Sequence, residues 1–75
     1  MTSIIEKDNS IILTGDKFDL KIDNNRKLYI KKKDEKKFSF VDYEVPIGLT
    51  SVEKKQLLYK LYFVIESRIN GEENV

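Results

Sequence analysis

The chain of 75 residues has no cysteine, no histidine and no tryptophan, and it contains one proline and three glycines. Cysteine and histidine are the usual ligands of structural zinc, and they are also the thiol nucleophile and the proton carrier of many enzymes. The three glycines are scattered and form no phosphate-binding loop. We therefore predict a protein that is not an enzyme, that binds no metal or cofactor and that has no small-molecule substrate.

Long apolar runs are also missing. No segment approaches the roughly 18 to 20 apolar residues that span a bilayer, and residues 1–10 lack the basic-then-apolar order of a signal peptide. We therefore expect a cytoplasmic protein that does not enter a membrane. Hydrophobic residues make up 40% of the chain and charged residues 36%, which is typical of a folded domain. The abundance of Lys, Ile, Asn and Asp suggests a bacterial or phage origin.

Residues 10–45 have the pattern of an antiparallel β-meander, because short apolar runs alternate with polar residues between turn-forming clusters. The alternation is cleanest over residues 18–22. Turns are expected at Gly15-Asp16 and after each of the next two strands, at residues 23–25 and 33–35. Ile4 and Ile5 form either an additional edge strand, paired through a turn at residues 7–9, or a frayed end.

The last predicted strand, residues 37–45, changes the phase of its alternation. Phe38 and Phe40 follow one phase, and the apolar residues after them follow the other. A β-bulge near Phe40 and Val41 would turn both sets toward the core, whereas a regular strand would leave Val41 and Tyr43 on the outer face. We favour the bulge.

Residues 51–70 are predicted to form one helix. Thr50 and Glu53 have the spacing of a capping box, and Gly71 suits the left-handed position that ends many helices. We expect a single α+β domain over residues 1–75, in which the helix covers the apolar face of a sheet of three to five strands. At 100° per residue, one broad side of the helix should face that sheet. Its apolar residues are Leu57, Leu58, Leu61, Tyr62, Val64, Ile65 and Ile69.

The opposite side of the helix carries a second apolar stripe. Val52, Tyr59 and Phe63 have the i, i+7 and i, i+4 spacings of neighbours on a helix surface. Either an N-terminal segment covers this stripe, or its rings are isolated surface residues, or it is an interface.

A domain of this size has a small core and gains stability from further burial. We therefore predict a non-enzymatic protein-binding module, such as a phage or mobile-element accessory protein, that docks on a host protein or forms a homodimer. The expected partner-binding residues are Val52, Tyr59 and Phe63, with Tyr29 and Tyr43 as an extension of that surface.

The hairpin of residues 26–37 suggests an alternative function, because it carries seven basic and two acidic side chains, a net charge of +5. A basic hairpin with an aromatic residue is typical of nucleic-acid binders. Edge lysines also prevent pairing with other chains, and the isoelectric point near 7.9 lies below the range of strongly basic domains. The candidate nucleic-acid contacts are Arg26, Lys27, Tyr29, Lys31, Lys32, Lys33, Lys36 and Lys37.

Overall fold

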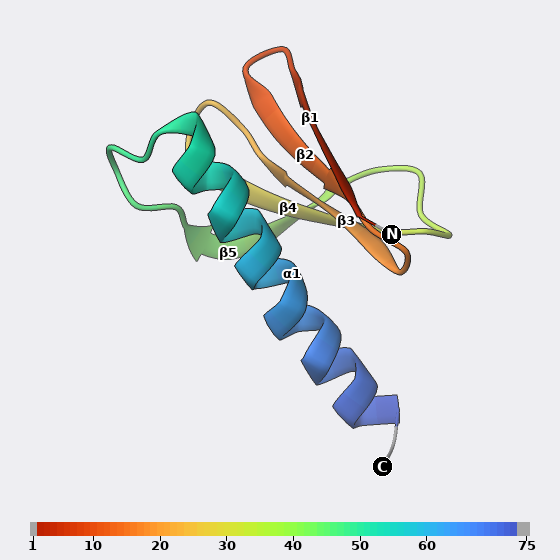
Figure 1. Ribbon diagram of the computed structural model, residues 1–75. Coiled ribbons are helices and arrows are strands. Elements are labelled where there is room, and N and C mark those ends of the chain that lie inside the picture. Colours follow the sequence, from red (N-terminus) through yellow and green to blue (C-terminus); the bar gives the residue numbers. More distant parts are fainter. Residues whose placement is uncertain (1, 74–75) are drawn as a thin grey trace.

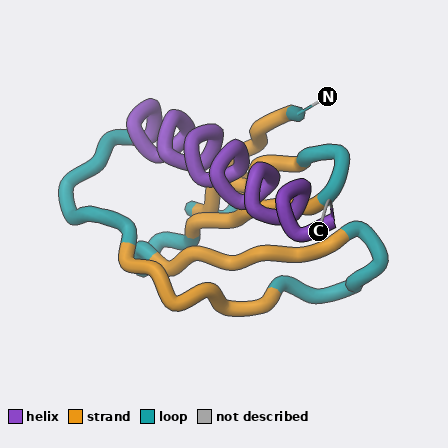
Figure 2. The backbone as a smooth tube through the Cα atoms, turned by 90° about the horizontal axis from the view of Figure 1, so that it is seen from below, coloured by secondary structure: helices purple, strands orange, loops and turns teal. Residues whose placement is uncertain are grey.

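The computed structural model describes residues 2–73, which form a five-stranded antiparallel sheet and one C-terminal helix (Figure 1). The strands follow chain order across the sheet, so that the first and the last are its two edges. The helix lies diagonally across one face (Figure 2), which we call the inner face. The predicted meander with one C-terminal helix is confirmed. The elements are β1 (Ser3–Lys7), β2 (Ser10–Thr14), β3 (Phe18–Ile22), β4 (Lys27–Lys32), β5 (Ser39–Glu44) and α1 (Ser51–Glu73).

The core lies between α1 and the inner face of the sheet. Alternate residues of β2, β3 and β4 point into it, as the period-two pattern predicts. The helix packs mainly on β2 and β3 and contributes two buried side chains. The buried apolar residues are Ile11, Leu13, Phe18, Leu20, Ile22, Leu28, Val45, Leu58 and Tyr62.

Tyr62 fixes α1 against the loop between β2 and β3. Its ring stacks on Phe18 with 4.3 Å between centroids, and its hydroxyl accepts a hydrogen bond of 3.3 Å from the backbone N–H of Lys17. A Cβ atom at Gly15 would overlap the Tyr62 ring. The loop contains three residues, 15–17, rather than the expected two, and glycine is required there for this close approach rather than for a left-handed backbone.

Ile4 and Ile5 belong to β1, which decides between the two alternatives for the N-terminal segment. Ile4 pairs with Leu13 of β2 and packs against the core. Asp8 and Asn9 have φ angles of 52° and 64°, the two successive left-handed residues of a tight hairpin turn.

The irregularity in β5 lies slightly later than expected. Leu28 pairs with Val41, but the preceding residue of β4, Lys27, pairs with Glu44. Residues 42 and 43 are therefore extra residues in β5. Because two residues are inserted, the alternation continues in the same phase on both sides of the irregularity.

The expectation that both apolar sets of β5 turn inward is wrong. Val41 and Tyr43 pack against the core, whereas Phe40 lies opposite Tyr29 on the outer face and is 57% exposed. The outer position is stabilised because the Phe40 ring meets Tyr29 edge-on at 6.0 Å and lies 5.5 Å from the ammonium of Lys27.

The start of α1 agrees with the prediction and its end does not. The backbone N–H of Thr50 donates to Glu53 Oε1 at 3.1 Å, and the Glu53 N–H donates to Thr50 Oγ1 at 3.2 Å, so the capping box is present. The helix continues to Glu73, and Gly71 lies within it. The left-handed glycine is instead Gly48, with φ 86°, in the loop before the helix.

Val64 was also expected in the core, but it is 41% exposed. Because α1 lies over β2 and β3, its flank toward β5 remains open, and Val64 is on that flank three residues beyond the half-buried Leu61.

Candidate functional site

The second apolar stripe of α1 is exposed. Val52 is 62% exposed, Tyr59 47% and Phe63 70%; we call these three residues the helix stripe. Within residues 2–73, the side chains of Tyr59 and Phe63 make no hydrogen bond, ring contact or cation–π contact. The alternative in which an N-terminal segment covers the stripe is therefore wrong, since β1 forms the edge of the sheet instead.

The first turns of α1 are joined to β1 by an ion pair. The Lys55 ammonium lies 2.7 Å from Glu6 Oε1, and the Ser51 hydroxyl donates to the same oxygen at 3.4 Å. These contacts, chiefly the hydrogen bond from Lys55, hold the pKa of Glu6 below its ordinary value. Lys55 therefore marks the side of α1 that faces β1.

The helix stripe continues along that side. Tyr59 and Phe63 follow Lys55 at intervals of four residues, which places the three on one side of the helix. The next turn of α1 reaches the β2–β3 loop through Tyr62, and this loop follows Thr14, the partner of Ser3. Helix α1 therefore lies over β2 and β3 and runs toward the end of the sheet where β1 begins, with the stripe on its β1 side.

The two tyrosines expected to extend the helix stripe lie elsewhere. Tyr29 is on the outer face of the sheet, between the core residues Leu28 and Ile30. Tyr43 is half-buried against the core from β5, the edge strand farthest from β1. The structure does not bring either residue into one surface with Tyr59.

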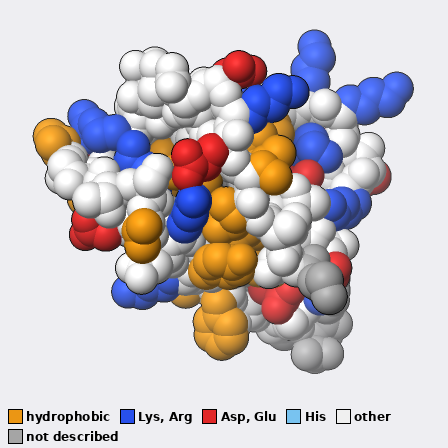
Figure 3. Space-filling view, turned by 45° about the horizontal axis from the view of Figure 1, so that its top comes forward, with side chains coloured by type: hydrophobic (Ala, Val, Ile, Leu, Met, Phe, Trp, Pro, Cys, Tyr) orange, Lys and Arg blue, Asp and Glu red, His pale blue; other side chains and the backbone are white. Residues whose placement is uncertain are grey.

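Hydrophobic side chains are visible at the surface of the molecule as a run through the middle of one face, between basic and acidic side chains (Figure 3). Apolar surface with a polar border is typical of association sites.

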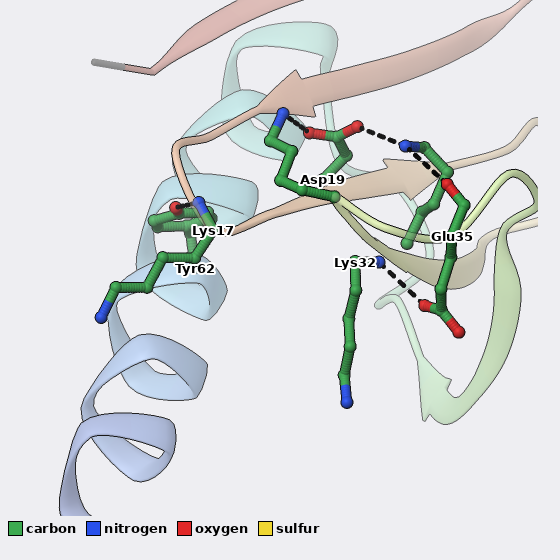
Figure 4. A network of polar contacts seen from close by, with 7 residues as sticks. Lys17, Asp19, Lys32, Glu35 and Tyr62 are labelled. Atoms are coloured by element: carbon green, nitrogen blue, oxygen red, sulfur yellow. Dashed lines mark hydrogen bonds and ion pairs between the residues drawn. The ribbon is translucent and has the colours of Figure 1, made fainter. Parts of the chain in front are cut away.

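The basic hairpin is largely occupied by contacts within the chain. Asp19 is only 7% exposed and lies between two lysine ammonium groups, 3.3 Å from Lys31 and 2.9 Å from Lys33 (Figure 4). Burial alone would raise the pKa of Asp19, but the two lysines outweigh it and hold the pKa below its ordinary value. Because Asp19 alternates with lysines along its strand, the sequence pattern predicts a solvated surface carboxylate, which is wrong. Lysines of the neighbouring strand and its loop cover Asp19 instead.

Besides Phe40, two aromatic rings of the outer face have partners. The Lys21 ammonium lies 4.8 Å from the centroid of Tyr29 and 4.7 Å from that of Phe38. The Tyr29 hydroxyl donates to Asp23 Oδ2 at 3.1 Å, and desolvation together with this carboxylate raises the pKa of Tyr29. The charges and rings of this face therefore stabilise one another.

The other candidate nucleic-acid contacts divide into two groups. Arg26, with φ 63°, donates from its guanidinium to the carbonyl of Val45 at 3.2 Å, which is a structural contact. Lys32, Lys36 and Lys37 are exposed, and none of the three forms an ion pair within the described part of the chain.

A groove of about 690 Å³ separates the C-terminal half of α1 from the ends of β3 and β4. Its floor is apolar and its border is charged, with both signs present. The lining residues are Asp16, Lys17, Phe18, Ile30, Lys32, Lys33, Asp34 and Ile69.

Residues 2–73 contain no group of three or more His, Cys, Asp or Glu side chains placed to hold a metal ion. In the same residues, no helix combines the length and the hydropathy that crossing a bilayer requires. Comparison of the chain with protein-family models, with curated proteins and with solved structures finds no match.

Proposed function

We propose that this domain is a non-enzymatic protein-binding module that docks on its partner through the helix stripe. The supporting observation is a contrast between neighbours on one helix. Leu58 and Tyr62 are 0% and 7% exposed, whereas the residues that follow them, Tyr59 and Phe63, are 47% and 70% exposed. Two exposed aromatic rings one turn apart, without hydrogen-bond or ring partners, are typical of an interface.

Covering the helix stripe would contribute favourably to binding. Complete burial of a large apolar side chain contributes about 1.5 to 3 kcal/mol, and aromatic residues are enriched among those that dominate binding. Tyr59 and Phe63 are already held on a capped helix, so docking orders little additional backbone.

The test is the double variant Tyr59→Ala with Phe63→Ala, compared with Phe40→Ala. Phe40 is the matched control because it is an exposed ring, 57% accessible, on the opposite face of the sheet. We expect the double variant to keep the circular dichroism and unfolding midpoint of the parent and to lose association in sedimentation and capture experiments. Phe40→Ala should keep association, and its unfolding midpoint should fall only slightly, through the lost contacts with Tyr29 and Lys27. Unfolding of the double variant would identify the stripe as core, and unchanged association would refute the proposed docking surface.

A second candidate function, binding of nucleic acid by residues 26–37, is supported by the exposed Lys32, Lys36 and Lys37. Lys31 and Lys33 are unsuitable for its test, because reversing their charge would also break the contacts with Asp19. Replacement of Lys32, Lys36 and Lys37 by Glu should abolish a gel shift that weakens as salt is raised. Absence of a shift by the parent protein at about 50 mM salt would exclude this function.

A further inference from the structure

The two edges of the sheet differ in their readiness to pair with another strand. The β5 edge has two inserted residues, 42 and 43, carries Asp42 and Glu44, and is followed by Pro46. Irregularity, charge and proline are the usual protections of an exposed edge. The β1 edge is regular over all five of its residues and has no proline; Ile4 and Ile5 lie near its centre, and its two charged residues, Glu6 and Lys7, lie at its C-terminal end. Of the two edges, β1 is therefore the better suited to pairing.

The charge nearest to the centre of β1 does not block this edge. Glu6 is engaged by Lys55 and Ser51 of α1, so its carboxylate is held toward the helix. A charge at this edge without such a partner would be buried unpaired when a neighbouring strand covers it. That burial costs free energy and would oppose pairing.

β1 is compatible with antiparallel pairing to itself. A register centred on Ile5 places Ile5 opposite its own copy and pairs all five residues of the strand. A shift by one residue would bring inner-face side chains opposite outer-face ones and is excluded by the alternation. Ile5 is 52% exposed and lies on the outer face, opposite Ile12.

The helix stripe lies on the β1 side of α1, above the inner face. A two-fold axis at Ile5 would therefore bring the stripes of both protomers toward the seam, over the two copies of Ile4. We propose that the partner of this module is a second copy of the same chain, joined through β1 into a continuous ten-stranded sheet and covered at the seam by Tyr59 and Phe63 of both protomers. This inference rests on the proposed function and names its partner.

The dimer is expected to be weak and concentration-dependent. Each copy contributes one strand of five residues and three stripe residues, which is less than the roughly 20 to 30 residues per partner of a standard stable interface. We therefore expect a dissociation constant on the order of micromolar.

The experiment uses sedimentation velocity of the full chain from about 5 to about 500 μM, a range that brackets such an affinity. Ile5→Lys places two like charges opposite each other at the axis and should weaken association at least about tenfold without changing the unfolding midpoint. Phe40→Lys, a matched change on the exposed outer face of β5, should leave the dimer unchanged. The distinguishing measurement is a mixture of Ile5→Lys with Ile5→Glu. Each alone should dimerise more weakly than the parent, and the mixture should form a heterodimer that is tighter than either homodimer, since residue 5 faces only its own copy.

Three results would overturn the second-copy inference, and they affect the proposed function differently. A dimer that survives Ile5→Lys but is lost in Tyr59→Ala with Phe63→Ala would refute edge pairing and support docking through the stripe. A monomeric parent that still captures a protein partner, with capture lost in the same double variant, would refute self-pairing and again support the stripe. A dimer unaffected by Ile5→Lys and by the double variant would refute both.

Discussion

The molecule has exposed or half-buried aromatic rings in two places, and they differ in what surrounds them. On the outer face of the sheet, Tyr29, Phe38 and Phe40 each have a lysine ammonium within 5.5 Å of the ring centroid. On α1, Tyr59 and Phe63 have no such partner among the described residues. The outer-face rings have cation–π partners within the chain, and the rings of the helix stripe do not.

This difference shows that exposure alone is a poor guide to an interface. Phe40 is more exposed than Tyr59, at 57% against 47%, yet covering Phe40 with a partner would require its contacts with Lys27 and Tyr29 to be rearranged. Covering Tyr59 would break no hydrogen bond, ring contact or cation–π contact within the described residues. The free energy available for docking therefore lies on the helix.

The largest effect expected separates two adjacent residues of α1. Leu58→Ala should lower the free energy of unfolding by about 2 to 5 kcal/mol, because a fully buried leucine leaves a cavity. Tyr59→Ala should change it by no more than about 0.5 kcal/mol, because a half-exposed ring without a hydrogen bond or ring partner contributes little to folding. Urea unfolding of the monomer, at a concentration below dimerisation, measures both. An equal loss of unfolding free energy in the two variants would mean that the stripe belongs to the core. The stripe would then not be a surface left without partners, and its contrast with the outer-face rings would disappear.

The orientation of the stripe depends on the contact between Tyr62 and Gly15. Gly15→Ala should destabilise the domain by about 1 to 3 kcal/mol, because the added methyl overlaps the Tyr62 ring. Gly71→Ala is the matched control. It lies within α1 with nothing near the added Cβ, and the better helix propensity of alanine should stabilise by up to about 1 kcal/mol. If Gly15→Ala leaves the stability of the domain unchanged, α1 can shift on the sheet to make room for the added methyl group.

On the outer face, Asp19→Asn should cost about 1 to 2 kcal/mol, since it weakens two charge-assisted contacts of a carboxylate that is 7% exposed. Asp34→Asn, in the exposed loop between β4 and β5, should have little effect. Thermal unfolding of the two variants compares a carboxylate inside the charge network with one outside it. Equal midpoints would show that the network contributes nothing measurable.

The same carboxylate gives a pH dependence whose sign is fixed. The pKa of Asp19 is lower in the folded chain than its ordinary value of 3.8. Its contribution is therefore present above about pH 4 and is lost as the pH falls through the folded pKa. The stability difference between the parent and Asp19→Asn should narrow as the pH is lowered below 4 in urea titrations. A constant difference would mean that the effect of the substitution is not electrostatic.

The features that follow from local sequence were predictable. The alternation over residues 18–22 and the pairing of Thr50 with Glu53 depend on neighbours within a few residues, and both appear in the structure as expected. The position of Phe40 depends on Tyr29 and Lys27 in another strand, so its own alternation could not decide its face. Local pattern also gave no reason for α1 to continue through Gly71.

The candidate site was predictable to the same extent. Helical periodicity placed Val52, Tyr59 and Phe63 on one side of α1, and they are exposed there together. That the stripe lies beside β1 depends on how α1 is oriented over the sheet, which is set by contacts between distant segments such as Lys55 with Glu6. The burial of Asp19 was missed for a related reason, because its cover comes from lysines of the neighbouring strand and its loop.

The smallest effect concerns the lysine above the outer-face rings. Lys21→Met keeps the length and apolar body of the side chain and removes the charge 4.8 Å from the Tyr29 centroid and 4.7 Å from that of Phe38. The expected loss is about 0.5 to 1 kcal/mol, the usual size of an exposed cation–π contact. Lys36→Met, a lysine without a ring partner, should cost nothing measurable in the same urea titration. If the two variants have the same midpoint, the contacts of Lys21 with the outer-face rings add no measurable stability. These rings would then not differ from those of the helix stripe. The choice of the helix as the docking surface would then depend on the β1 edge alone.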